Sequence, residues 1–176
     1  MRHFRNIALV GFMGTGKSTV GQLVAEALHF QFIDTDAKIE ERAGKSIAQI
    51  FATEGESTFR QMESDLVREL ETKEHFVIST GGGLMVNPEN FASLHEHSLI
   101  VCLWANPETI SQRVRHQTHR PLLQHNDPAE KIRALLKERT PAYKKADTLV
   151  TTELRSPREV AMQVLKHFSL ARKTVE

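Results

Sequence analysis

The hydrophobic pattern of the chain is a series of short, uninterrupted apolar runs separated by longer amphipathic segments. Five runs, partly β-branched, are candidate strands: residues 7–10, 30–33, 76–78, 99–103 and 148–151. Because uninterrupted apolar runs suit strands that are buried on both faces, they predict a mostly parallel sheet. After Ser57, apolar residues recur at helical spacing on one face: Phe59, Met62, Leu66, Val67 and Leu70. This alternation of strands and helices predicts an α/β fold.

Helix starts are marked by four pairs in which a capping residue precedes proline: Asn87-Pro88, Asn106-Pro107, Asp127-Pro128 and Ser156-Pro157. The capping side chain satisfies a free backbone N–H, and proline fits the first helical position, where its N–H is not needed. Glu130 and Glu159 complete the spacing of a capping box after Asp127 and Ser156. The polar stretch 116–126 breaks the pattern, so we expect a lid over about residues 113–126.

Length and composition narrow the classes of function. The 176 residues predict a single domain over 1–176. With 23 Lys and Arg against 22 Asp and Glu, the net charge is +1. This balance argues against nucleic-acid and membrane partners, which require a basic face, and no run reaches the ~18 apolar residues of a membrane span. The single cysteine, Cys102, allows no internal disulfide, so we expect a reducing compartment, the cytoplasm.

The strongest chemical signal is the segment Gly11–Ser18, GFMGTGKS, which matches G-x-x-x-x-G-K-[ST] in full. A predicted strand precedes it and an amphipathic segment follows it, as a phosphate-binding loop requires. Its backbone N–H groups are expected to face the β-phosphate of a nucleoside triphosphate, supported by the helix dipole. Lys17 is expected to bridge the β- and γ-phosphates, and the Ser18 hydroxyl to ligate Mg²⁺.

Two carboxylates, Asp34 and Asp36, follow the second predicted strand. In an open parallel sheet this edge faces the ligand crevice, and both side chains point the same way if the strand continues. We expect Asp34 to hold the water shell of the metal and Asp36 to accept a proton from an attacking hydroxyl. The alternative is an ordinary aspartate at a strand end and a helix N-cap.

A second glycine cluster, Gly81–Gly83, follows the third predicted strand, where many P-loop proteins carry an acidic residue. Three glycines allow a ligand to approach the bare backbone and its N–H donors. The alternative is a flexible turn.

Features that the chain lacks restrict the possible acceptors of the phosphoryl group. Its length is too short for a helicase or a transport ATPase, and it has no Asn-Lys-x-Asp segment for reading guanine. These observations favour a small-molecule kinase over a GTPase switch protein.

Taken together, these motifs resemble shikimate kinases over about residues 7–150. The resemblance rests on separated segments in order: GFMGTGKST from Gly11, DTD at 34–36, IFATEGE at 50–56, Phe59-Arg60, Glu63, Gly81–Gly83, RPLL at 120–123 and RTPAY at 139–143. It implies ATP-dependent phosphorylation of the 3-hydroxyl of shikimate, a step toward chorismate and the aromatic amino acids. It also implies a monomer with a three-layer P-loop fold, a five-stranded parallel sheet of order 2-3-1-4-5 and a shikimate-binding helical region at about 34–62.

The resemblance also implies roles for single residues. Asp36 is expected to hold the substrate hydroxyls and to serve as the base, and Arg120, on the lid, to reach the transferring phosphate; with Lys17 these form the expected catalytic set. Nucleotide contacts are expected at Gly14, Thr15, Gly16, Lys17, Ser18, Thr19, Arg113, Arg120 and Arg155. Shikimate contacts are expected at Asp36, Arg60, Gly81, Gly82, Gly83 and Arg139, and metal contacts at Ser18 and Asp34.

The chemistry of shikimate fits these roles, because its carboxylate suits guanidinium forks and its three hydroxyls suit a carboxylate acceptor. Without the resemblance, Arg60 and Arg139 would be interpreted as solvated residues of amphipathic helices. The nearest alternative is another small-molecule kinase of this fold, such as gluconate kinase. A nucleotide-dependent switch protein is the alternative from a different class.

Overall fold

The computed structural model describes residues 2–115 and 128–173. Its centre is a five-stranded parallel sheet of order β2-β3-β1-β4-β5. The strands are β1 (Asn6–Val10), β2 (Gln31–Asp34), β3 (Phe76–Ser79), β4 (Ser98–Trp104) and β5 (Thr148–Thr151). All five apolar runs therefore form strands, and the predicted strand order is confirmed.

Eight helices and one 3₁₀ turn connect the strands within the described residues. They are α1 (Lys17–Leu28), α2 (Thr35–Ala43), α3 (Ile47–Thr53), α4 (Glu56–Leu70), η1 (Leu84–Val86), α5 (Pro88–His97), α6 (Pro107–Val114), α7 (Pro128–Tyr143) and α8 (Pro157–Lys173). No helix in these ranges combines the length and the apolar character that crossing a membrane requires.

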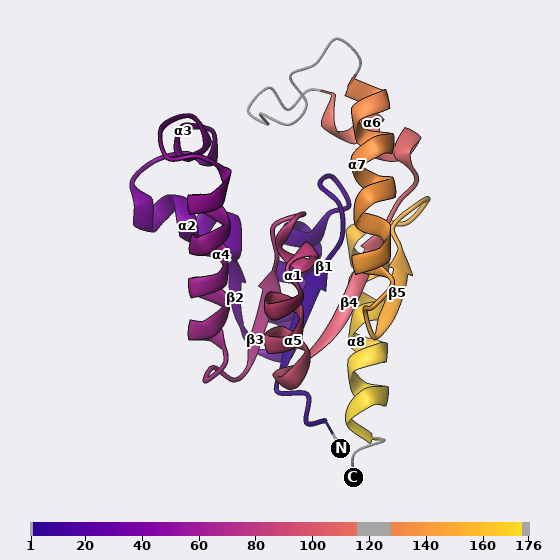
Figure 1. Ribbon diagram of the computed structural model, residues 1–176. Coiled ribbons are helices and arrows are strands. Elements are labelled where there is room, and N and C mark those ends of the chain that lie inside the picture. The colour runs from indigo at the N-terminus through magenta and orange to yellow at the C-terminus, as the bar shows by residue number, and fades with distance from the viewer. Residues whose placement is uncertain (1, 116–127, 174–176) are drawn as a thin grey trace.

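Helices cover both faces of the sheet, which gives the three expected layers (Figure 1). The alternation of side chains along β1 feeds two cores: Ile7 and Leu9 pack with α1 and α8, whereas Ala8 and Val10 pack with α4, α5, α6 and α7. All four side chains are buried. A strand with apolar residues in both directions can only lie at the centre of such a sandwich, which explains the uninterrupted run.

A smaller third core holds α2, α3 and α4 together. It is built on Ile39, Ile50, Phe59 and Leu66, all buried. Figure 1 shows these three helices on one side of the molecule and α6 and α7 on the other, with the end of β1 between them. The region predicted to bind shikimate, 34–62, corresponds to Asp34, α2, α3 and the first half of α4.

The predicted helix caps are present wherever the structure describes them. Asn87 Oδ1 accepts from the N–H of Glu89, and Asn106 Oδ1 from that of Thr109. Ser156 and Glu159 form the expected reciprocal capping box at α8. Asp127 lies outside the described residues, but α7 begins at Pro128 as its position predicts.

Candidate functional site

A cavity of about 570 Å³ lies at the carboxyl ends of β1, β2 and β3. This is the edge at which open parallel sheets bind ligands. The predicted site residues that line it come from six separate segments: Gly14, Gly16, Lys17, Ser18, Thr19, Asp34, Asp36, Arg60, Gly81, Gly82, Gly83, Arg113 and Arg139. The fold therefore brings together the phosphate-binding loop, the acidic pair, the glycine cluster and the arginines.

The loop between β1 and α1 has the conformation that its glycines predict. Gly14 has φ 76° and Gly16 has φ 90°, values that favour glycine. Gly16 is the N-cap of α1 and provides no side-chain cap, and the first turn of the helix lines the cavity, so the N-terminus of α1 borders the cavity without a side-chain cap. Lys17 is only 8% exposed, and its Nζ donates to the carbonyls of Gly11 (2.9 Å) and Phe12 (3.0 Å). The loop thus combines a buried ammonium with a helix N-terminus at the edge of the cavity, which gives it a cationic character.

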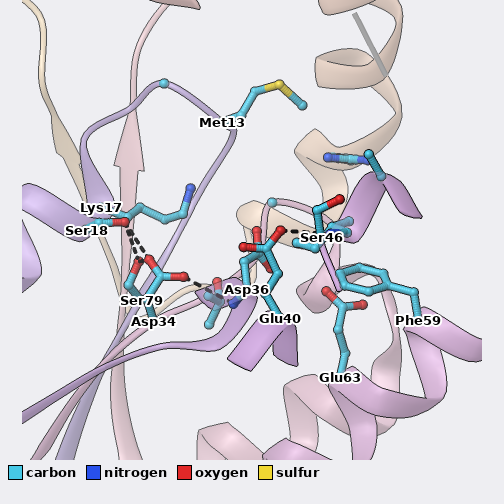
Figure 2. Close-up of a pocket in the computed structure, with 18 of the residues that line it drawn as sticks. Met13, Lys17, Ser18, Asp34, Asp36, Glu40, Ser46, Phe59, Glu63 and Ser79 are labelled. Atoms are coloured by element: carbon cyan, nitrogen blue, oxygen red, sulfur yellow. Dashed lines mark hydrogen bonds between the residues drawn. The ribbon is translucent and has the colours of Figure 1, made fainter. Parts of the chain in front are cut away.

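Beside the loop, three oxygen-bearing side chains meet (Figure 2). Ser18 Oγ donates to Asp34 Oδ2 at 2.5 Å, and Ser79 Oγ donates to the same oxygen at 3.1 Å. Ser79 is the last residue of β3, where many P-loop proteins carry an acidic residue. Asp34, at the end of β2, supplies a carboxylate next to this position. One carboxylate and two hydroxyls of this kind fit Mg²⁺, which takes oxygen ligands and usually keeps one or two protein carboxylates beside phosphate oxygens.

Asp34 also caps a helix, and this changes the predicted geometry of the acidic pair. Its Oδ1 accepts from the N–H groups of Asp36 (3.1 Å) and Ala37 (3.3 Å). The strand therefore ends at Asp34, and Asp36 lies in the first turn of α2. The strand does not continue to Asp36, so strand alternation does not align the two carboxylates, and Asp34 is the helix N-cap of the stated alternative. Both line the cavity, because the cap bends the chain there.

The three glycines after β3 form a wall of bare backbone against four charged side chains. A Cβ on Gly81 would collide with Asp36 Oδ1 and lie 3.0 Å from Glu63 Oε1. A Cβ on Gly83 would lie 2.8 Å from Arg60 Nη1, and one on Gly82 would lie 3.3 Å from Arg139 Nη1. A side chain at Gly81 or Gly83 would displace the end of Asp36 or of Arg60, so close packing against charged groups favours glycine at these two positions.

Arg139 is buried, contrary to its interpretation as a solvated helix residue. It is 6% exposed, and its guanidinium carbon lies 5.5 Å from the centre of the Phe12 ring. Tyr143, one turn along α7, donates its hydroxyl to the Gly82 carbonyl at 2.6 Å. Burial raises the pKa of the Tyr143 phenol, so the donor stays protonated. α7 is thereby fixed to the glycine wall, which holds Arg139 at the cavity.

Glu63 is a cavity residue that we did not assign a role from the sequence. It is 1% exposed, and Arg60 Nη1 donates to its Oε2 at 2.7 Å. Burial raises the pKa of Glu63 to about 7, although Arg60 opposes the rise. The signal was available, because Glu63 stands four residues after Phe59 and three before Leu66, on the apolar face of α4.

Of the residues predicted to contact the nucleotide, some lie beside the P-loop and others do not line the cavity. Arg113, in the last turn of α6, donates to the carbonyls of Gly14 (3.3 Å) and Thr152 (2.9 Å), beside the P-loop. Arg155 donates to the Thr151 carbonyl and does not line the cavity. Thr15 is buried and its hydroxyl donates within the loop, to the Phe12 carbonyl. Arg120 and most of the predicted lid lie outside the described residues.

Comparisons with known proteins agree on one kind of enzyme. A family model described as shikimate kinase matches residues 13–169. A curated shikimate kinase of Pelotomaculum thermopropionicum is 51% identical over 84% of this chain and 86% of its own length. A shikimate kinase of Acinetobacter baumannii, solved in complex with shikimate, superposes with a TM-score of 0.92 at 37% identity, over 96% of this chain and 95% of that one.

A gluconokinase of Sinorhizobium meliloti also superposes, with a TM-score of 0.67 at 17% identity, over 99% of this chain and 97% of that one. That likeness concerns the fold alone. The far higher identity to the shikimate kinases separates the two alternatives left open by the P-loop.

Proposed function

The chain belongs to the shikimate kinase family and phosphorylates shikimate with ATP, and we propose that the cavity beside the P-loop holds both substrates for this reaction. The observation that carries the proposal is the composition of that cavity: Lys17 lines it together with Arg60 and Arg139, and Asp36 lies between Lys17 and the α4 side (Figure 2). A cationic cradle for phosphates and a guanidinium pair for a carboxylate thus share one space.

On the donor side, the N–H groups of the loop and the start of α1 bind the β-phosphate of ATP. When ATP binds, Lys17 leaves the carbonyls that it contacts in the structure and bridges the β- and γ-phosphates, because an ammonium interacts more strongly with anionic phosphates than with neutral carbonyls. Arg113 supports the nucleotide from the Gly14 side, which its contacts with Gly14 and Thr152 favour. Arg155 remains a predicted contact of the nucleotide.

On the acceptor side, Arg60 and Arg139 bind the carboxylate of shikimate, with the Gly82 and Gly83 backbone against it. Asp36 accepts hydrogen bonds from the hydroxyls. In the transfer itself, the 3-hydroxyl oxygen bonds to the γ-phosphorus, the bond from that phosphorus to the β–γ bridging oxygen breaks, and Asp36 takes the hydroxyl proton. ADP leaves with the bridging oxygen. Positioning and charge neutralisation supply most of the rate acceleration in such reactions.

Ser18 and Asp34 are the residues that would hold Mg²⁺, with Ser79 orienting the carboxylate. The ion supplies neutralisation of the charge that develops on the phosphate oxygens. Asp34 serves this site through the oxygen that faces Ser18, while its other oxygen caps α2.

The double role of Asp34 gives a test of the metal site. Asparagine caps helices about as well as aspartate, so we expect Asp34→Asn to keep the thermal stability of the protein and to lose metal affinity. The loss should be about 10- to 100-fold, the size seen when groups that orient a metal site are altered. Paramagnetic Mn²⁺ binding to the protein–ADP complex measures it without turnover, and the Mg²⁺ dependence of turnover should shift in parallel. Asp34→Ala should lose stability as well. Unchanged Mn²⁺ affinity in Asp34→Asn would contradict the assignment.

We also propose that residues 113–126 act as a lid and that Arg120 reaches the transferring phosphate. Support comes from both flanks of this segment: α6 ends beside the P-loop through Arg113, and α7 carries Arg139 into the cavity. We propose that the protein acts as a monomer in the cytoplasm. The groups that the proposed chemistry needs at the cavity, Lys17, Asp36, Arg60 and Arg139, are supplied by this chain itself, so the chemistry requires no partner subunit, and the substrates are soluble.

The function is tested by ADP release with a panel of acceptors: shikimate, gluconate and nucleoside monophosphates. We expect shikimate alone to stimulate release strongly, because gluconate has a carboxylate but not the ring that places a hydroxyl at Asp36. Strong stimulation by another acceptor and none by shikimate would overturn the proposal. Nucleotide binding without any acceptor-dependent turnover would instead favour the switch-protein alternative.

A further inference from the structure

Glu63 is the most deeply buried charged side chain that lines the cavity in the described residues, and phosphoryl transfer gives it no role. It lies on α4, next to Phe59 in Figure 2. Its Oε2 accepts from Arg60 Nη1 at 2.7 Å, and its Oε1 lies beside the Gly81 backbone, where Asp36 Oδ1 also lies. Glu63 therefore touches the acceptor-binding groups and not the nucleotide loop.

Three charged groups face the Glu63 carboxyl from three helices. They are Arg60 on α4, Asp36 on α2 and Arg139 on α7. With Glu63 ionised, two guanidiniums and two carboxylates balance. Arg60 already donates to Glu63 and to the exposed Glu56. A bound acceptor adds a third carboxylate to the set around Glu63, so Arg60 must then serve a further anion. In a buried site an unbalanced negative charge is costly, and the least costly relief is protonation of the carboxyl with the poorest solvation.

We propose that Glu63, which holds the Arg60 guanidinium through its Oε2, takes up a proton when the carboxylate of the acceptor binds. The inference rests on the proposed function, since it requires an acceptor that carries a carboxylate. Before binding, the ionised Glu63 holds the Arg60 guanidinium at the cavity wall. After binding, the protonated Glu63 still hydrogen-bonds within the site but no longer competes for the charge of Arg60.

Burial holds the pKa of Glu63 at about 7, so this carboxyl is poised to change its charge near neutral pH. The sign of the pH dependence follows. A second anion beside Arg60 raises the pKa of Glu63 further, so the complex binds more protons than the free enzyme. Acceptor affinity is then full below pH 7 and falls as the pH rises above it. Linkage of one proton limits the fall to about tenfold per pH unit.

Calorimetric titration of the full chain with shikimate at about pH 8, in two buffers that differ in ionisation enthalpy, measures this proton uptake directly. We expect the wild-type protein to take up a large fraction of one proton per shikimate bound and to show the fall in affinity. Glu63→Gln imitates the protonated carboxyl, so its uptake should vanish and its affinity should stay flat over the same range. Persistent uptake in Glu63→Gln would overturn the proposal.

The matched control is Glu56→Gln. Glu56 Oε1 also accepts from Arg60, at 2.9 Å and on the same helix, but its side chain is 61% exposed. Proton uptake should survive this substitution, because solvent supports the charge of Glu56 in both states. Loss of uptake in both variants would assign the effect to Arg60 in general and contradict a specific role for Glu63.

ATP binding reports whether Glu63→Gln keeps its fold. If that variant does not fold, an infrared difference spectrum of the wild-type protein decides: a carboxylic-acid C=O band must appear when shikimate binds, and its absence overturns the proposal. Wild-type protein that binds shikimate with no proton uptake contradicts this inference but leaves the proposed function standing. Wild-type protein that neither binds shikimate nor releases ADP with it contradicts the proposed function itself.

Discussion

Asp36→Asn should lower kcat by about 10²–10⁴-fold while ATP binds nearly as tightly as in the wild type. The substitution keeps the size and shape of the side chain in the first turn of α2, and it keeps the backbone N–H that Asp34 accepts. It removes the negative charge that orients the attacking hydroxyl and receives its proton. ADP release at saturating shikimate measures the loss, and calorimetry measures ATP affinity.

Asp65→Asn is the matched control for this prediction. Asp65 lies on α4, in the same group of helices, but its side chain is 56% exposed and contacts Gln61 and Arg68 outside the cavity. It should keep wild-type turnover. If Asp36→Asn also kept it, Asp36 would leave the catalytic set. A fall in ATP affinity as large as the fall in kcat would instead assign Asp36 to the support of Asp34.

Local sequence signals predicted the strands and the helix starts of this protein well. The runs that became β1, β3 and β4 lie at the centre of the parallel sheet, where both faces of a strand are buried, whereas β2 and β5 are the edge strands and are only partly buried. The caps at Asn87, Asn106 and Ser156 were predictable because a side-chain oxygen next to proline acts on the nearest few N–H groups. Interactions within four residues of each other can be inferred from the sequence alone.

Local spacing also predicted the phosphate-binding loop that lines the cavity, whereas several contacts between distant residues could not be predicted in this way. Arg139 is buried because Tyr143 fixes α7 to Gly82, a contact between residues 61 positions apart. Ser79 meets Asp34 only because β2 and β3 pair in register. The N-cap role of Asp34 is local and was an alternative open from the sequence, but its contact with Ser18, 16 positions away, was not predictable from spacing. Such contacts depend on tertiary pairing, which residue spacing does not encode.

Glu63 differs from these cases. Its position on the apolar face of α4 can be seen from the sequence, but the groups that surround it cannot. An acid on the apolar face of an amphipathic helix indicates burial, but burial of a carboxylate is tolerable only with a partner. Arg60, one turn earlier, is that partner, and the glycine wall encloses the pair. The helix pattern could show that Glu63 is unusual. Only the fold shows that it faces an acceptor cavity.

Lys17→Met should give the other large loss, at least about 10²–10³-fold in turnover, because it removes a preorganised charge at the phosphates that react. Lys17 is nearly buried, and its Nζ lies against the Gly11 and Phe12 carbonyls, so the ammonium is held in the loop before ATP arrives. Methionine fills a similar volume without charge, which separates the electrostatic role of Lys17 from its packing.

Lys38→Met controls for the loss of a positive charge as such. Lys38 pairs with Glu41 on the exposed side of α2 and does not line the cavity. It should retain wild-type turnover and ATP affinity. In Lys17→Met, by contrast, the loss should persist at saturating ATP, because the bridge between β- and γ-phosphate strengthens as the γ-phosphoryl group departs. A variant whose loss disappeared at high ATP would show that Lys17 binds the ground state only, and transition-state stabilisation would then have to come from Arg120 and the metal site.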